Sequence, residues 1–167
     1  MLIELLHEQQ KRRGASFRVP HFSIQRDHLH LIVEADDGEL TSGIRSFLIR
    51  FARKLNRLFG RKKGKVWGDR YHRRDLASPT ETRNALIYVL NNDAKHGLRK
   101  ASTSGPANID IFSSGPLFDG WCVPTTRITY AVPWPDMRPR TWFLREGWRR
   151  KGGGPVDPRK TPGPRSL

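Results

Sequence analysis

The sequence is poor in cysteine and acidic residues, and it has no long hydrophobic run. Cys122 is the only cysteine among the 167 residues, which excludes an internal disulfide and a cysteine-based zinc site. A chain without disulfides suits a reducing compartment, so we expect it in the cytoplasm. No stretch of 18 apolar residues occurs, which excludes a membrane-spanning helix.

The shortage of acidic residues leaves a large positive charge. Lys and Arg number 31 against 16 Asp and Glu, so the net charge is +15 and the isoelectric point is near 11.0. Such an excess repels itself in a compact fold unless a polyanion neutralises it. Nucleic acid is the first partner that this charge indicates, and an anionic membrane surface is the second.

Hydrophobic periodicity predicts helices and strands that follow one another with short connections. Helices are expected over residues 1–13, 40–59 and 79–96. Strands are expected over residues 16–25, 28–35, 65–67 and 70–76. The second helix should bury one apolar stripe, made of Ile44, Phe47, Leu48, Phe51, Leu55 and Leu58. The order of elements predicts an α+β fold, an antiparallel sheet with helices packed on one side.

Periodicity is lost after residue 98, and the composition changes. We expect residues 101–150 to form an extension with little regular structure, apart from one short element near residues 140–149. Residues 151–167 contain Gly152-Gly153-Gly154 and four prolines, which is typical of a disordered basic tail. The predicted organisation is therefore a folded domain over residues 1–100, an extension and a tail.

Two histidines in the second strand could bind a metal ion. His28 and His30 alternate with apolar residues, so both imidazoles should point to one face, roughly 7 Å apart along the strand. Two neutral imidazoles cannot complete a metal site, so a third ligand must come from elsewhere. The alternative is that two histidines share a polar sheet face by chance.

The third helix offers a polar pair. Tyr88 and Asn92 are four residues apart and should share one helical face, where a phenol nucleophile would lie beside a metal ligand. The alternative is a tyrosine that is half in the core, next to a solvated asparagine. Asn91 is the neighbouring competitor, but it should point about 100° away from Asn92.

A basic segment separates these elements. Residues 44–74 hold twelve Lys or Arg and one acid, Asp69, and no acids at four-residue spacing balance the charge. A track for a phosphate backbone explains this better than an ordinary solvated face. Trp67, Tyr71 and His72 could stack on unpaired bases, although core packing explains Trp67 equally well. The residues expected to bind nucleic acid are Arg50, Arg53, Lys54, Arg57, Arg61, Lys62, Lys63, Lys65, Arg70 and Arg73.

Three motifs in this order resemble a known family. HLHLIV at residues 28–33, WGDRYH at 67–72 and NALIYVLNN at 84–92 are similar to the HUH class of single-strand DNA transposases, in particular to the REP-associated tyrosine transposases. The likeness covers about residues 16–97, with weaker traces at FDGW, residues 118–121, and RTW, residues 140–142.

The resemblance implies a fold and a chemistry. It implies a ferredoxin-like sheet, with residues 1–100 as the catalytic domain, in a bacterial protein associated with the nucleoid. It implies Mg²⁺ or Mn²⁺ held by His28, His30 and Asn92, and Tyr88 as the nucleophile. Members cleave and rejoin single-stranded DNA beside small hairpins. They also begin with a strand before the first helix, and this sequence begins at the helix, so we expect that strand to be missing.

Two other functions remain open at this point. A sheet-based module that binds single-stranded nucleic acid without chemistry would explain the charge and the aromatic residues. A degenerate, inactive transposase would explain the motifs. We expect single-stranded or hairpin DNA as the partner and no membrane, and the sequence is compatible with a monomer or a homodimer. A metal titration separates an enzyme from a pure binder, because a binder should show no metal-dependent cleavage.

Overall fold

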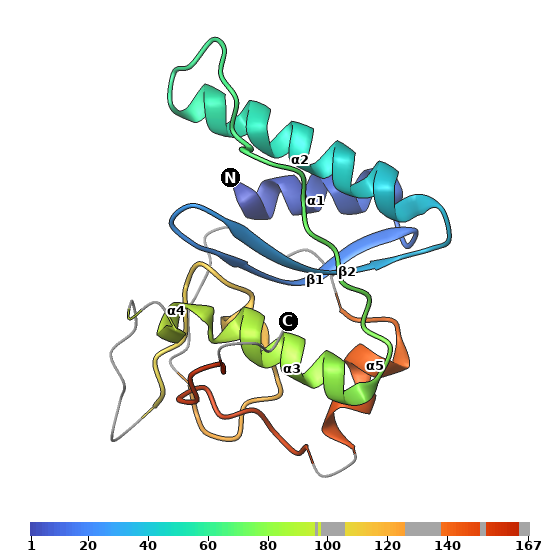
Figure 1. The fold of residues 1–167 in the computed structure, drawn as a ribbon, viewed down its shortest axis with the longest axis vertical. Coiled ribbons are helices and arrows are strands. Elements are labelled where there is room, and N and C mark those ends of the chain that lie inside the picture. The colour runs from blue at the N-terminus through green and yellow to red at the C-terminus, as the bar shows by residue number, and fades with distance from the viewer. Residues whose placement is uncertain (96, 98–105, 126–137, 151–152, 164–167) are drawn as a thin grey trace. The chain divides into compact units, whose positions relative to one another are not determined.

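The structure is a computed structural model that describes residues 1–95, 97, 106–125, 138–150 and 153–163, and it has an α+β fold (Figure 1). Its elements are α1 (Leu2–Arg13), β1 (Phe17–Ile24), β2 (Leu29–Ala35), α2 (Glu39–Leu58), α3 (Pro79–Leu90), α4 (Asn92–Lys95), η1 (Gly115–Leu117), α5 (Trp142–Arg145) and η2 (Gly147–Arg149). No helix within the described ranges is long and apolar enough to cross a membrane.

The two strands form an antiparallel hairpin, as predicted. The N–H of Gln25 donates to the carbonyl of His28 at 2.9 Å beside the turn, and the N–H of Asp36 donates to the carbonyl of Ser16 at 2.9 Å at the open end. The strands predicted over residues 65–67 and 70–76 are wrong. These residues have no regular secondary structure, and β1 and β2 are the strands of the sheet in the part of the chain that the structure describes.

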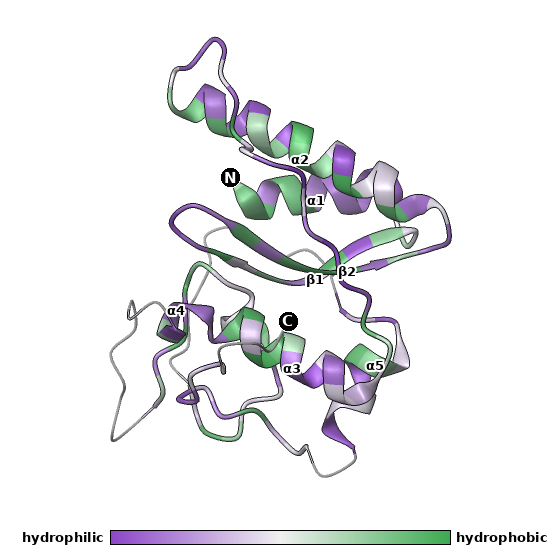
Figure 2. Ribbon diagram, viewed as in Figure 1, coloured by the Kyte–Doolittle hydropathy of each residue, from purple (hydrophilic) through white to green (hydrophobic). Residues whose placement is uncertain are grey.

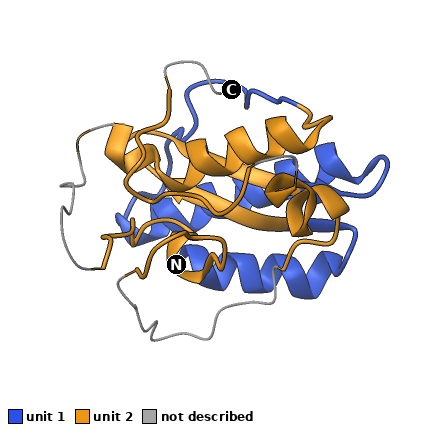
Figure 3. Ribbon diagram, turned by 90° about the horizontal axis from the view of Figure 1, so that it is seen from below, with its two compact units in different colours: residues 1–18, 34–74, 130–137 blue, residues 19–33, 75–129, 138–167 orange. Residues whose placement is uncertain are grey.

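The chain divides into two compact units, which Figure 3 shows in different colours. Unit 1 comprises residues 1–18, 34–74 and 130–137, and unit 2 comprises residues 19–33, 75–129 and 138–167. The hairpin contributes residues to both units. This grouping differs from the ranges 1–100, 101–150 and 151–167 expected from the sequence. That these three ranges are separate domains stays a prediction.

Unit 1 is built on α1 and α2. Its buried apolar side chains are Leu2, Leu5, Leu6, Phe17, Ile44, Phe47 and Phe51. Gly43 is required by close packing, because a Cβ at this position would lie 2.1 Å from the ring of Phe17. The predicted stripe of α2 is correct for Ile44, Phe47 and Phe51 but not for Leu58, which is 67% exposed. Leu48 and Leu55 are half-buried, so the fully buried stripe ends at Phe51, about two turns before the helix does.

Unit 2 is built around α3, whose start is capped by Ser78 and Glu81. The hydroxyl of Ser78 accepts from the N–H of Glu81 at 3.2 Å, and the Glu81 carboxylate accepts from the N–H of Ala77 at 2.9 Å. The core of the unit consists of Ile32, Ala85, Leu86, Val89, Leu90, Phe118, Leu144, Trp148 and Val156. The short element expected near residues 140–149 is present as α5 and η2.

Residues 112–114 pair with the C-terminal half of β1. Ser23 and Ser113 form an antiparallel bridge, and the N–H of Ile24 donates to the carbonyl of Phe112 at 2.9 Å. The ring of His21 is buried next to the hydroxyl of Ser114, with Nδ1 and Oγ 3.3 Å apart. Burial lowers the pKa of His21 to about 4, and the negative charge of Asp119 opposes this in smaller measure.

Residues 153–163 differ from the disordered tail that the composition predicts. Val156 is 1% exposed, its N–H donates to the carbonyl of Gly120 at 2.7 Å, and its carbonyl accepts from the N–H of Cys122 at 2.9 Å. The burial of this one valine fixes the segment, and an average composition rich in glycine and proline gives no sign of it. Residues 151–152 and 164–167 of the predicted tail lie outside the described residues.

Candidate functional site

The two predicted metal-binding histidines lie side by side at the start of β2. The ring centroids of His28 and His30 are 4.7 Å apart, in an edge-to-face arrangement. His28 precedes the first residue of β2, which comes one residue after the expected start of the strand, so the pair lies next to the hairpin turn. Asp27 Oδ1 is 2.7 Å from His28 Nδ1, which favours a proton on Nδ1 and makes Nε2 the ligand atom of this ring.

Tyr88 comes from α3 and contacts the histidine pair. Its ring centroid is 5.1 Å from that of His30, again edge to face. The tyrosine is half-buried and packs against the core of unit 2, while the ammonium of Lys95 lies 4.7 Å from its ring centroid. Three rings from two elements distant in the sequence thus form one row, His28, His30 and Tyr88.

Asn92 lies beyond a break in the helix, so one part of the prediction is wrong. The expected helix over residues 79–96 ends at Leu90, and Asn92 is the first residue of α4; residue 96 lies outside the described residues. Asn91 forms the break, with φ −112° and ψ 16°. Tyr88 and Asn92 therefore do not share the face of one continuous helix.

The two asparagines at this break have opposite environments, although both are fully buried. The amide of Asn91 donates to the carbonyls of Asp157 and Lys160 at 3.1 and 3.0 Å, so it ties residues 157–160 to the end of α3. Within the described part of the chain, neither Oδ1 nor Nδ2 of Asn92 has a hydrogen-bond partner. The solvated asparagine of the alternative hypothesis is therefore wrong.

The donor types present are ones that a divalent ion accepts, nitrogen from imidazole and oxygen from an amide. Two adjacent imidazoles are present, and the buried Asn92 carries an amide oxygen that the protein itself does not use. Among the residues described, no three His, Cys, Asp or Glu side chains gather closely enough to hold a metal ion. A site here would therefore need an amide, a substrate oxygen or water beside the histidines.

Two of the ten predicted DNA-binding cations are used inside unit 1. The ammonium of Lys54 lies 2.7 Å from Glu8 and 3.7 Å from Glu4, and the guanidinium of Arg50 donates to Gln9. The hydrogen bond from Lys54 lowers the pKa of Glu8, and burial lowers that of Arg50. The balancing acids come from α1, so spacing along α2 could not reveal them. Arg50 and Lys54 hold α1 on α2.

The other eight predicted cations are exposed. They are Arg53 and Arg57 on α2, Arg61, Lys62, Lys63 and Lys65 in the loop that follows, and Arg70 and Arg73 farther along the chain. Figure 2 shows mainly hydrophilic colours along the loop after α2.

Trp67 packs on Phe51, with ring centroids 5.3 Å apart, and its Nε1 donates to the carbonyl of Leu48 at 3.0 Å. Core packing is therefore correct for Trp67, while Tyr71 and His72 are exposed.

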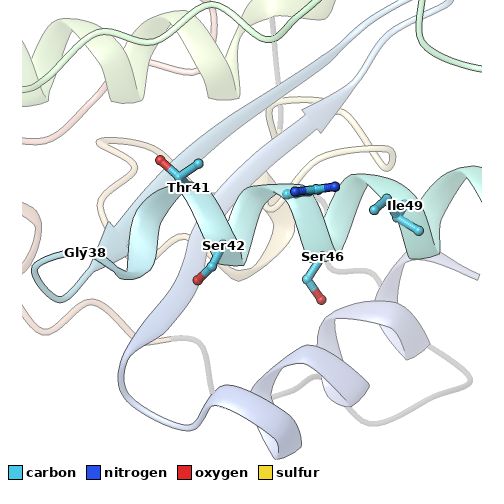
Figure 4. A pocket seen from close by; sticks show the side chains of 6 residues that line it. Gly38, Thr41, Ser42, Ser46 and Ile49 are labelled. Atoms are coloured by element: carbon cyan, nitrogen blue, oxygen red, sulfur yellow. The ribbon is translucent and has the colours of Figure 1, made fainter.

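Sequence reasoning missed three residues of these surfaces. Arg45 is exposed on α2 and lines an open groove of about 430 Å³ with Gly38, Thr41, Ser42, Ser46 and Ile49 (Figure 4). Asp27 contacts His28, and Lys95 contacts the ring of Tyr88. Arg45 lies two four-residue steps before Arg53 and three before Arg57 on α2, which was a usable signal for Arg45, whereas Asp27 and Lys95 depend on tertiary geometry.

The chain has no match among protein-family models, among curated proteins or among solved structures.

Proposed function

We propose that this chain is a metal-dependent transposase or nuclease that cleaves and rejoins single-stranded DNA near hairpins through a 5′-phosphotyrosine. The observation that carries the proposal is the row of His28, His30 and Tyr88, which joins the start of β2 to α3 with ring centroids 4.7 and 5.1 Å apart. A nucleophile beside metal ligands is the arrangement that this reaction needs. The resemblance in the three motifs gives the same assignment.

The residues present fit Mg²⁺ or Mn²⁺. His28 and His30 would hold the ion, with Asn92 as the oxygen ligand, because its buried amide has no other partner in the described structure. Bound there, the ion would neutralise charge that develops on the scissile phosphate. Asp27 orients the ring of His28 through the contact at Nδ1.

Tyr88 would carry out the covalent step. Its hydroxyl oxygen attacks phosphorus, the bond from phosphorus to the 3′-oxygen breaks, and the leaving 3′-oxygen ends as a hydroxyl with the proton that the phenol gives up. The strand downstream of the cut stays on Tyr88 through its 5′-phosphate, so the reverse attack by a 3′-hydroxyl rejoins DNA without a further energy source. Lys95, whose ammonium lies 4.7 Å from the Tyr88 ring centroid, would attract the phosphate.

Exposed cations would supply most of the affinity for DNA. Six neutralised phosphates would give a salt slope near −4 for a single strand, at about −0.7 per phosphate. In keeping with this function we propose the ferredoxin-like form of the α+β fold, a monomer or homodimer and a place in the bacterial cytoplasm. The order of helix, hairpin and further helices along the chain supports the ferredoxin-like arrangement.

A module that binds single-stranded nucleic acid without chemistry is the second candidate. The observation in its favour is the group of eight exposed cations, which needs no contribution from Tyr88. A degenerate transposase would behave in the same way in a binding assay. Both predict that metal ions have no effect on the DNA.

The test is incubation with hairpin-bearing single-stranded oligonucleotides and Mn²⁺, scored for a covalent adduct on a denaturing gel. We expect an adduct from the unmodified chain and from Tyr71→Phe, which removes an exposed phenol, and none from Tyr88→Phe. His28→Ala should abolish the adduct but retain most of the binding. Metal-independent binding without any adduct would favour the module and contradict the enzyme.

A further inference from the structure

The end of α2 exposes two large apolar side chains. Leu58 and Phe59 are 67% and 63% exposed and lie about two turns beyond Phe51. No membrane-spanning or core role accounts for them, since Phe51 is the last buried apolar residue of α2. Two adjacent exposed apolar side chains of this size suggest a binding surface.

The backbone holds this tip in one conformation. Gly60, at φ 63°, reverses the chain, its N–H donates to the carbonyl of Arg57 at 3.1 Å, and the N–H of Arg61 donates to the carbonyl of Asn56 at 2.8 Å. These two bonds form a Schellman motif. The side chain of Asn56 also donates to the carbonyl of Gly64 at 3.1 Å, which closes the loop. Phe59 is therefore presented on an ordered turn and loses little freedom on binding.

The surroundings of Phe59 are cationic. The guanidinium of Arg61 lies 5.6 Å from its ring centroid, and exposed Arg57, Lys62 and Lys63 are its neighbours in the chain. The sequence from residue 40 to residue 68 contains no Asp or Glu. A ring within a group of cations is suited to a partner that carries both flat apolar groups and closely spaced negative charges.

We propose that this tip, residues 57–63, binds unpaired bases of single-stranded nucleic acid, with Phe59 stacked on a base and the four cations on flanking phosphates. Each base has an aromatic face, and its phosphates match the charge around Phe59. An anionic membrane is the weaker partner, because two apolar side chains on a turn bury little area and no amphipathic face continues from them. The proposal deepens the DNA partner of the proposed function and rests on it for the choice of DNA.

The test compares two phenylalanines of nearly equal exposure. Phe59→Ala should weaken binding of a labelled single-stranded oligonucleotide about tenfold, within the range for loss of one stacked base. Phe112, which is 61% exposed and lies in unit 2, supplies the matched control, and Phe112→Ala should bind like the unmodified chain. Phe59→Trp should retain or improve the affinity, because the larger ring still stacks.

Salt and duplex measurements separate stacking from charge. Phe59→Ala should leave the salt slope unchanged, whereas the double variant Lys62→Ala/Lys63→Ala should make it less negative by about 1.4 if both contact phosphates. Binding of a blunt duplex should be insensitive to Phe59. Equal losses for duplex and single strand, or unchanged single-strand affinity of Phe59→Ala, would overturn the proposal. Binding to phosphatidylserine vesicles that depends on Phe59, without an effect on DNA, would overturn it in favour of a membrane.

The outcome is independent of catalysis. If Tyr88→Phe still forms the adduct while Phe59→Ala loses affinity, the proposed nucleophile is wrong and the tip assignment holds. If the adduct depends on Tyr88 but Phe59→Ala binds normally, the enzyme stands and the tip assignment is wrong. Circular dichroism of each variant shows whether it is folded, and Leu58→Ala gives a second perturbation of the same tip.

Discussion

Replacement of Asn92 by leucine should make the metal-free protein more stable. The side chain is 0% exposed, and neither of its polar atoms has a hydrogen-bond partner in the described structure. A buried polar group left unsatisfied costs about 1–3 kcal/mol, and leucine has the same branched shape without polar atoms. We therefore expect Asn92→Leu to raise the free energy of unfolding by about 1–3 kcal/mol in the presence of a chelator.

Asn91 provides the matched control with the opposite sign. It is equally buried, but its amide donates to the carbonyls of Asp157 and Lys160. Asn91→Leu removes both bonds, so the free energy of unfolding should fall by about 1–3 kcal/mol. Urea unfolding followed by circular dichroism measures both variants, provided that the m-value stays constant.

Addition of Mn²⁺ completes this test. A ligand that binds only the folded state stabilises it, by about 2.7 kcal/mol at a concentration one hundred times its dissociation constant. The unmodified chain should gain stability from Mn²⁺, and Asn92→Leu should gain much less. If Asn92→Leu destabilises the metal-free protein as strongly as Asn91→Leu does, the amide of Asn92 has a structural role and the reasoning is refuted.

Three further predictions concern acid stability, packing and the basic surface. The pKa of His21 falls to about 4 on folding, so the folded protein keeps the neutral ring while the unfolded chain takes up a proton near pH 6.5. The contribution of His21 to the free energy of unfolding should therefore be complete above pH 6.5 and fall by about 3 kcal/mol as the pH drops to 4. A His21→Gln variant with the same pH slope as the unmodified chain would contradict this. Gly43→Ala places a Cβ 2.1 Å from Phe17 and should lower the free energy of unfolding by about 1–3 kcal/mol in urea, less the gain in helix propensity, whereas Gly68→Ala, with nothing within 4 Å, should not. Arg53→Ala should weaken single-strand binding in an anisotropy assay. The adjacent Lys54→Ala should leave binding intact and cost at most about 1 kcal/mol of stability, because Lys54 is paired with Glu8. Equal binding losses for the two variants would show that Lys54 contacts DNA.

Local pattern predicted most of the regular elements. The hairpin, the start of α3 at Ser78 and the body of α2 follow from alternation, capping chemistry and helical periodicity, which act over a few residues. The strand-like residues 65–67 have the right composition for a strand. Trp67, the last of them, instead packs on Phe51 and donates to the carbonyl of Leu48 in α2, so tertiary contact overrides propensity.

The candidate site was predictable only in part. Alternation brought His28 and His30 to one side, and the family resemblance singled out Tyr88, which lies beside His30. The break at Asn91 was not predictable, because it accompanies hydrogen bonds to residues 157 and 160 that are distant in the sequence. The pairing of Lys54 with α1 was hidden for the same reason.

Identification of the residue that carries DNA tests the central claim most directly. The chain has three tyrosines, Tyr71, Tyr88 and Tyr130, so a nuclease-trimmed adduct can be digested and its modified peptide assigned by mass spectrometry. We predict a nucleotide on Tyr88, formed only with Mg²⁺ or Mn²⁺ present and absent from His28→Ala and His30→Ala. A nucleotide on Tyr71 or Tyr130, or attachment that is unaffected by loss of both histidines, would contradict the account.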